Sequence, residues 1–285
     1  MQIHLQSGAL SAVIDSFGAQ LISLCKNSEE YIWQRDPRFW PECCPILFPL
    51  VSSLQNNQYT YRGKTYTIPK HGFARHSEFA ATEQNESSAT LRLIQTEETA
   101  ASYPFSFDFL VSFNLSGSKL DCAYTVINTS ADETMYFNTG AHEGYQLFDG
   151  GDIADHYLIF EQPEHLVRRY SGQTDLFEGD IHDFGISDRF DLDDAYFAND
   201  AVFFLDLKSH YVTLCSKTST KRVRVAFDAR NLGIWKIPGA SYVCIEPWDG
   251  FCQTAWSDGQ LAHKERIQIL APGCTHIVRH SVEIL

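Results

Sequence analysis

Residues 108–127, DFLVSFNLSGSKLDCAYTVI, are the part of the sequence that decides the expected fold. Val111, Phe113 and Leu115 alternate with polar residues, which is the period of two that a half-buried β-strand requires. A short turn over residues 116–118 follows, and apolar residues then alternate again to the end of the stretch. Two such runs joined by a glycine-containing turn predict an antiparallel hairpin.

The same pattern recurs along the chain, and no long stretch has helical periodicity. Residues 9–24 predict two strands joined by a turn at Phe17 and Gly18, and residues 211–215, 223–227 and 266–270 predict further strands. The 20 Phe and 13 Tyr residues suit sheets that pack face to face. Without an internal repeat or a Gly/Ser linker, we expect an all-β fold, a large antiparallel β-sandwich forming a single domain over residues 1–285.

The composition excludes several classes of protein. A net charge of −14 argues against nucleic acid or an anionic membrane as a partner, because both require a basic surface. The N-terminus has no signal-peptide pattern and no apolar run is long enough to span a membrane, so a cytoplasmic location is expected. The eight cysteines lack regular spacing, which favours buried reduced thiols over disulfides.

The most informative functional stretch is residues 242–250, YVCIEPWDG. With strand periodicity, Cys244 and Glu246 share one face of the strand. Pro247 cannot continue a central ladder, so Glu246 is expected where the strand meets a loop. A carboxylate there, beside Trp248, can be partly desolvated and its pKa raised, as a general base requires. A solvated or capping Glu is the alternative interpretation.

Three other segments contain residues that could perform chemistry. His71 and Arg75 follow a short expected strand and can point into one concavity, although an incidental surface loop fits equally well. His142 follows another expected strand, among small residues that would let a ligand approach its imidazole. Asp200 precedes an apolar strand, where an Asp more often caps a turn.

Other chemistries have weaker support. Eight Asp and one Glu lie in residues 175–200, but the spacing of an EF-hand is missing, so an exposed surface excursion is expected rather than a metal site. The sequence contains no phosphate-binding glycine loop and no complete nucleophile elbow. Glu246 with Asp200 could form the carboxylate pair of a glycosidase, and this alternative stays open.

Taken in order, several motifs make this chain resemble the aldose 1-epimerase (galactose mutarotase) family, and within it a bacterial branch associated with the lactose operon. The likeness covers nearly the whole chain, and the motifs around His71 and Glu246 are the most distinctive. The motifs are GAQL (18–21), YIWQ (31–34), PILFP (45–49), HGFAR (71–75), GAH (140–142), NDA (199–201), LGIW (232–235) and CIEPW (244–248).

This resemblance implies a sugar in a cleft on one curved sheet, with anomer exchange as the reaction. By the resemblance, Glu246 would be the general base for the anomeric hydroxyl and His142 the general acid for the ring oxygen. His71, Arg75, Asp200 and Trp248 would bind the substrate. The substrate would be a small-molecule hexose or related aldose, and the reaction would need neither metal nor other cofactor.

Three segments differ from the family pattern, and the last of them, residues 249–252, replaces a pattern that commonly carries an Asp. Ser52 and Ser53 stand where many members have Gly-Arg, and Glu143, Gly144 and Tyr145 stand where the branch usually has Pro-Ala-Phe. The first difference removes a cationic contact, and Glu143 is expected to alter the charge of the pocket. A hexose-6-phosphate epimerase and a non-catalytic sugar-binding or sensing protein therefore remain as alternatives. The sequence does not determine the sugar or the oligomeric state.

Overall fold

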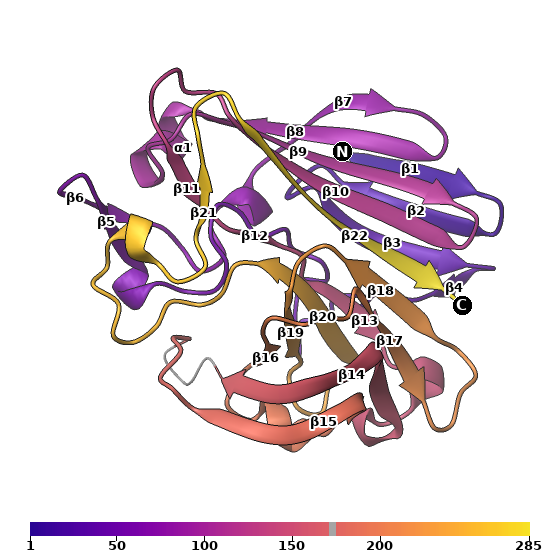
Figure 1. The fold of residues 1–285 in the computed structure, drawn as a ribbon. Coiled ribbons are helices and arrows are strands. Elements are labelled where there is room, and N and C mark those ends of the chain that lie inside the picture. Colours follow the sequence, from indigo (N-terminus) through magenta and orange to yellow (C-terminus); the bar gives the residue numbers. More distant parts are fainter. Residues whose placement is uncertain (171–174) are drawn as a thin grey trace.

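Most of the chain lies in antiparallel strands, as the sequence predicts (Figure 1). The computed structural model describes residues 1–170 and 175–285. Its main sheet contains 14 strands within this described part of the chain. In order across the sheet, twelve of them are β12 (Thr139–Gly140), β20 (Tyr242–Asp249), β19 (Asn231–Trp235), β16 (Val202–Phe204), β14 (His156–Tyr170), β17 (Tyr211–Ser216), β18 (Val223–Phe227), β22 (Thr275–Ile284), β10 (Lys119–Asn128), β9 (Phe107–Ser116), β8 (Ser88–Ile94) and β7 (Ala80–Gln84).

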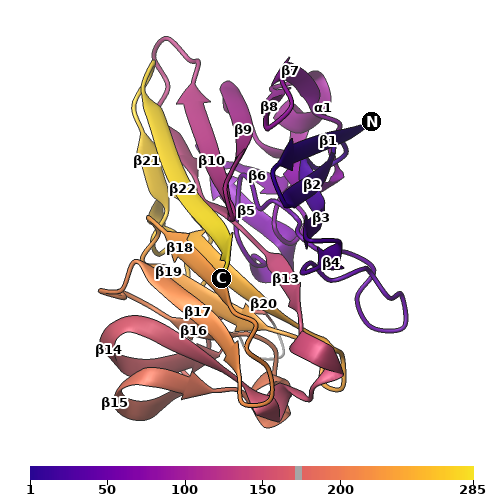
Figure 2. The same cartoon turned by 90° about the vertical axis from the view of Figure 1, so that its right-hand side faces the viewer.

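The remaining strands extend or cover this sheet. β13 (Glu143–Gln146) pairs with β20, and β15 (Ile181–Asp191) pairs with β14. A second sheet of β1 (Gln2–Ser7), β2 (Leu10–Asp15), β3 (Gln20–Lys26) and β4 (Glu29–Glu30) packs against β8 and β9 (Figure 2). Two small sheets pair β11 (Met135–Phe137) with β21 (Gln268–Leu270) and β5 (Gln58–Tyr61) with β6 (Lys64–Thr67). The predicted antiparallel β-sandwich is therefore confirmed.

Helices are short in the described residues. The single α-helix of residues 1–170 and 175–285 is α1, which spans Glu97–Ser102. Thr96 caps it, because the Thr96 side chain accepts a hydrogen bond from the backbone N–H of Thr99 at 3.2 Å. Six 3₁₀ turns lie in connections: η1 (Gln55–Asn57), η2 (Ala74–His76), η3 (Phe148–Gly150), η4 (Ile153–Asp155), η5 (Asp194–Phe197) and η6 (Leu261–His263). No described helix is long and apolar enough to cross a membrane.

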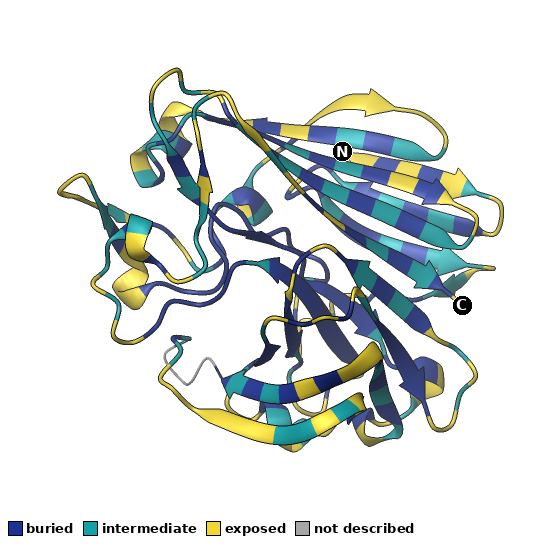
Figure 3. Cartoon of the chain, viewed as in Figure 1, coloured by how far each residue is buried: buried dark blue, intermediate teal, exposed yellow. Residues whose placement is uncertain are grey.

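The predicted hairpin is formed by β9 and β10, with Ser116 opposite Lys119. Every second residue of β10 is buried, which gives the alternating colours of this strand in Figure 3. The predicted strands within residues 9–24, 211–215 and 223–227 are also present, as β2, β3, β17 and β18. The strand expected over residues 266–270 is shorter, because β21 begins only at Gln268.

A long connection over residues 31–54 covers one face of β20. Trp33 and Trp40 pack against Tyr242 of β20, with ring centroids 4.7 and 5.3 Å apart, respectively. The indole N–H of Trp33 also donates to the backbone oxygen of Trp40. Connections of this length without regular structure are uncommon unless they are functional. This one helps to bury β20 and forms a wall of the pocket beside Glu246.

All eight cysteines are free thiols. Six of them are buried, as the sequence predicts, whereas Cys25 is half-buried and Cys274 is exposed. The prediction of buried reduced thiols is therefore correct for six positions and wrong for these two.

Candidate functional site

Glu246 lies inside a strand and not at its end, which corrects the sequence-based expectation. β20 continues through Pro247 to Asp249, and Glu246 pairs with Gly233 of β19. The side chain is only 1% exposed. Pro247 is accommodated inside the strand. Its carbonyl oxygen accepts a hydrogen bond from the backbone N–H of Ala141 at 3.0 Å, which shows that the polar backbone side of Pro247 faces the segment between β12 and β13. The side of Pro247 that lacks an N–H thus faces a break between β12 and β13, where no ladder bond is lost.

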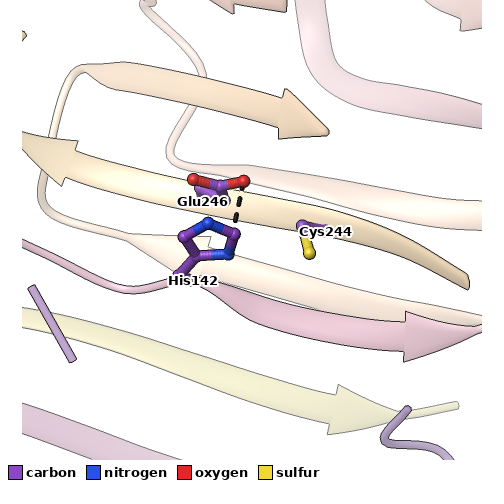
Figure 4. Close-up of side chains that lie close together, drawn as sticks. All are labelled: His142, Cys244 and Glu246. Carbon is purple, nitrogen blue, oxygen red and sulfur yellow. Dashed lines mark ion pairs between the residues drawn. The ribbon is translucent and has the colours of Figure 1, made fainter. Parts of the chain in front are cut away.

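His142 lies in that same break. β12 ends at Gly140 and β13 begins at Glu143, so the chain leaves the ladder at Ala141 and His142. This places the imidazole against the carboxylate of the facing strand: His142 Nδ1 lies 3.4 Å from Glu246 Oε1 (Figure 4). Trp40 and Trp235 flank the imidazole, with ring centroids at 5.2 and 5.6 Å.

His71 is held in an unusual backbone conformation beside the pair. Its φ of 66° is in the left-handed region, which a residue with a Cβ rarely adopts. His71 Nδ1 accepts a hydrogen bond from the backbone N–H of Ser52 at 3.0 Å. Burial lowers the pKa of His71 well below its ordinary value, and the nearby His142 ring adds to the effect. The neutral ring therefore carries its proton on Nε2 and can donate a hydrogen bond.

Two cations line the site, and each is paired with a carboxylate. Arg75 forms an ion pair with Glu42, from the connection that covers β20. Lys70 donates to Asp175 at 2.8 Å and lies 3.9 Å from Asp200. Lys70 thus places a second cation close to Ser53, whose hydroxyl donates to the same Asp175 carboxylate at 3.2 Å.

These side chains surround a pocket of about 210 Å³. It brings together all six candidates from the sequence, namely Glu246, His142, His71, Arg75, Asp200 and Trp248. It also contains residues that sequence reasoning missed: Trp40, Glu42, Ser52, Lys70, Ala201, Phe203 and Trp235. Lys70 directly precedes the HGFAR motif, so its position was a usable signal. Glu42 had none, because only the fold brings it to Arg75.

Burial sets the protonation of the central pair. It raises the pKa of Glu246 well above its ordinary value, and the charge of Asp200 raises it further, whereas Lys70 opposes this shift. Burial also lowers the pKa of His142 to about 3, with Arg75 contributing. Both shifts favour uncharged side chains, because a charge without water or a full ion pair is unstable in such a site.

Glu143 does not line the pocket, although its charge affects Glu246, in the direction of the expected change in the pocket's charge. It is buried elsewhere, and its Oε1 lies 2.9 Å from Nε2 of His280. Burial disfavours the His280 imidazolium, but Glu143 and Cys122 together outweigh this and raise the pKa of His280 well above its ordinary value. Glu143 is the first residue of β13, and its side chain points to His280 rather than into the pocket. Glu143 acts on the site only at a distance, by adding to the raised pKa of Glu246.

The Asp-rich segment of residues 175–200 lies in two different environments. Its middle forms β15, which is mostly exposed, as expected of a surface excursion. Its ends reach the site, where Asp175 accepts hydrogen bonds from Lys70 and from the Ser53 hydroxyl. Within the part of the chain that the structure describes, the one group with the spacing of metal ligands lies elsewhere, at His142, Cys244 and Glu246.

A family model described as aldose 1-epimerase matches residues 1–277. The chain belongs to the aldose 1-epimerase family. Members of this family are isomerases, so the expectation of an isomerase with a mutarotase-type function is confirmed at that level. A sugar substrate is consistent with the same membership.

Individual relatives of this epimerase-family chain support the same family membership. Plasmid and chromosomal forms of Protein LacX from Lactococcus lactis subsp. lactis are 32% identical over 305 aligned residues, which cover 100% of both chains. A galactose mutarotase related enzyme from Lactobacillus acidophilus is 33% identical, with a TM-score of 0.95 over 100% of this chain and 97% of that one. A galactose mutarotase-like protein from Lactobacillus casei is 26% identical, with a TM-score of 0.94 and complete coverage of both chains.

Proposed function

We propose that this protein is an aldose 1-epimerase that interconverts the α and β anomers of an uncharged hexose or related aldose. The observation that carries the proposal is the buried contact between His142 and Glu246, with Nδ1 and Oε1 3.4 Å apart, beside a pocket of about 210 Å³. Anomer exchange needs a proton removed from one oxygen and a proton delivered to its neighbour. A carboxylate and an imidazole in contact can do both.

In the proposed reaction, Glu246 takes the proton from the anomeric hydroxyl and a C=O bond forms at C1. The bond between C1 and the ring oxygen breaks, and His142 donates a proton to that oxygen. Rotation about the C1–C2 bond and closure with the two roles reversed give the other anomer. Ring opening thus starts from an ionised Glu246 and a protonated His142, and it ends with Glu246 protonated and His142 neutral, which is the uncharged distribution that burial favours.

The other pocket residues have binding roles in this proposal. The Nε2–H of His71 donates to a sugar oxygen, because Nδ1 is already occupied by the Ser52 N–H. Arg75 and Asp200 bind hydroxyls, and each is held by a neighbour of opposite charge. The rings of Trp40, Trp235 and Trp248 offer apolar faces to the C–H groups of a sugar.

Charge favours an uncharged sugar over a hexose 6-phosphate. A phosphate requires Arg or Lys side chains that are available to pair with it. Among the described lining residues, the cations are Lys70 and Arg75, and both already pair with carboxylates. Two acidic side chains besides Glu246, those of Glu42 and Asp200, line the same pocket and would repel a phosphate.

The direct test is polarimetry or one-dimensional NMR on freshly dissolved α-D-glucose and α-D-galactose. We expect faster approach to an unchanged anomer ratio when the protein is present. Acceleration with phosphosugars alone would overturn the preference for an uncharged substrate. Sugar binding without acceleration would instead establish a binding or sensing protein.

The pH dependence of kcat/KM tests the charges around Glu246. The negative charge of Asp200 raises the pKa of Glu246, so Asp200→Asn should lower that pKa and let the base remain ionised at lower pH. Lys70 has the opposite effect, so Lys70→Met should raise it. We expect the acid limb to move by about half a pH unit downward in the first variant and upward in the second.

Polarimetry across the pH range measures the acid limb of each variant. Each substitution can also weaken sugar binding, but that effect lowers the whole profile and does not move its midpoint. Shifts of the two variants in the same direction would contradict the assignment of Glu246 as the group that titrates.

A further inference from the structure

We propose that His142, Cys244 and Glu246 form an inhibitory binding site for a divalent transition-metal ion of the zinc class. One imidazole nitrogen, one thiol sulfur and one carboxylate oxygen of these residues all lie within 4.8 Å of one another (Figure 4). This set combines ligand types that zinc commonly uses in proteins. The proposed reaction uses His142 and Glu246 but gives Cys244 no role.

The strand geometry brings the three ligands together. Cys244 and Glu246 are two residues apart in β20, so their side chains emerge on the same face. His142 comes from the break opposite, two residues before Gly144, which pairs with Cys244. Because rigid strands carry or flank every ligand, the site needs little rearrangement to close around an ion.

The distances suit a small tetrahedral ion. Zinc bonds to nitrogen and oxygen are about 2.0–2.2 Å long, so two such ligands at a tetrahedral angle lie about 3.3–3.5 Å apart. His142 Nδ1 and Glu246 Oε1 are 3.4 Å apart. The sulfur needs a separation of about 3.6 Å from each of them. The sulfur lies no more than 4.8 Å from the other two ligand atoms, so each separation must shorten by about 1.2 Å at most.

Two of the three proposed ligand atoms lack the hydrogen bond that a buried polar atom normally makes. His142 Nδ1 and Glu246 Oε1 are buried and have no hydrogen-bond partner among the described residues. Buried polar atoms are normally satisfied, and exceptions often mark a functional site. An ion between them would satisfy both, and the pocket would leave a fourth position open to water or a sugar oxygen.

Metal binding requires loss of the thiol proton. Binding should therefore strengthen as pH rises, since protons compete for the same atoms. Ca²⁺ and Mg²⁺ should bind poorly, because they prefer sets of oxygen ligands.

The first experiment measures binding without using activity. Co²⁺ is added to the reduced full-length protein, and a thiolate-to-metal charge-transfer band is expected in the ultraviolet spectrum. Cys244→Ala should lose this band, whereas Cys215→Ala, which removes a buried thiol from β17, should keep it. A band that survives in Cys244→Ala would overturn the proposal and would indicate another thiol, such as the exposed Cys274.

The second experiment measures the consequence for anomer exchange, and only this part rests on the proposed function. Zn²⁺ should inhibit the wild type reversibly, with recovery on chelation, and sugar should protect because it occupies the same atoms. Cys244→Ala should keep its basal rate within about twofold and need at least about tenfold more Zn²⁺ for half inhibition.

The two experiments separate the possible failures. Inhibition that is equal in wild type and Cys244→Ala would reject the metal site while leaving the epimerase proposal intact. A Cys244-dependent cobalt band in a protein without epimerase activity would support the metal site and reject the proposed function.

Discussion

Glu246→Gln is expected to lower the rate of anomer exchange by about 10²–10⁴-fold while sugar affinity changes by no more than a few-fold. The amide has nearly the same shape as the carboxyl group but cannot accept the anomeric proton. Polarimetry gives the rate, and calorimetry or NMR titration gives the affinity. A rate within a factor of two of wild type would show that Glu246 is not the base.

The double variant adds a sharper test of the same assignment. His142→Asn should cause a comparable loss, because the acid acts in the same step as the base. Glu246→Gln combined with His142→Asn should then cost less than the sum of the two single losses. Full additivity would contradict joint action of the two residues.

A control must separate chemistry from folding. Glu164 is also buried but lies outside the pocket, where its Oε1 accepts from the N–H groups of Lys208 and Ser209. Glu164→Gln keeps an acceptor oxygen there and should leave the rate nearly unchanged.

Stability should respond to Glu246→Gln in the opposite direction from activity. The folded-state pKa of Glu246 is above its unfolded value, so the native protein is favoured while the group is protonated. That advantage is complete below the unfolded pKa of about 4.3 and is lost as pH rises through the folded-state value. The uncharged Gln avoids this loss, so its melting temperature at alkaline pH should equal or exceed that of wild type.

Gly72→Ala is expected to lower the free energy of unfolding by about 3 kcal/mol or more. Gly72 has a φ of 75°, and an added Cβ would lie 2.3 Å from the backbone oxygen of Phe48. That oxygen cannot move easily, because it accepts hydrogen bonds from the N–H groups of Phe73 and Ala74. The Phe48 ring is also buried, with its centroid 4.4 Å from that of Phe109.

Gly63→Ala is the matched control for this prediction. Gly63 has a similar φ of 73°, but an added Cβ there would meet nothing within 4 Å. Gly63→Ala should therefore lower the free energy of unfolding only by the strain of a left-handed backbone at Ala, about 1 kcal/mol. Thermal unfolding should show a fall of roughly 5–10 °C for Gly72→Ala. Equal losses in the two variants would show that close packing against Phe48 is unimportant.

Activity should also fall in Gly72→Ala. Gly72 follows His71, whose own left-handed backbone presents its ring to the pocket. Any shift of the Phe48 contact would move that ring. Because His71 is proposed to bind sugar, the loss should appear as a higher KM in the protein that remains folded.

The sequence alone determined the strands and the set of candidate residues. Alternating burial has a strong signature, so the β9–β10 hairpin could be predicted from residues 108–127. The motifs identified six residues that the structure brings to one pocket, from His71 to Trp248. That residues 1–285 form one domain remains our proposal, and the family match over residues 1–277 supports it.

Only the tertiary structure decided how these residues are paired and charged. The course of β20 through Pro247 depends on the break in its neighbour, which local sequence cannot reveal. Glu42 reaches Arg75 because a connection folds over β20, and Glu143 pairs with His280 from a distant strand. Protonation follows from this burial: the charge states of His142 and Glu246 depend on the lost water and on neighbours that the fold supplies.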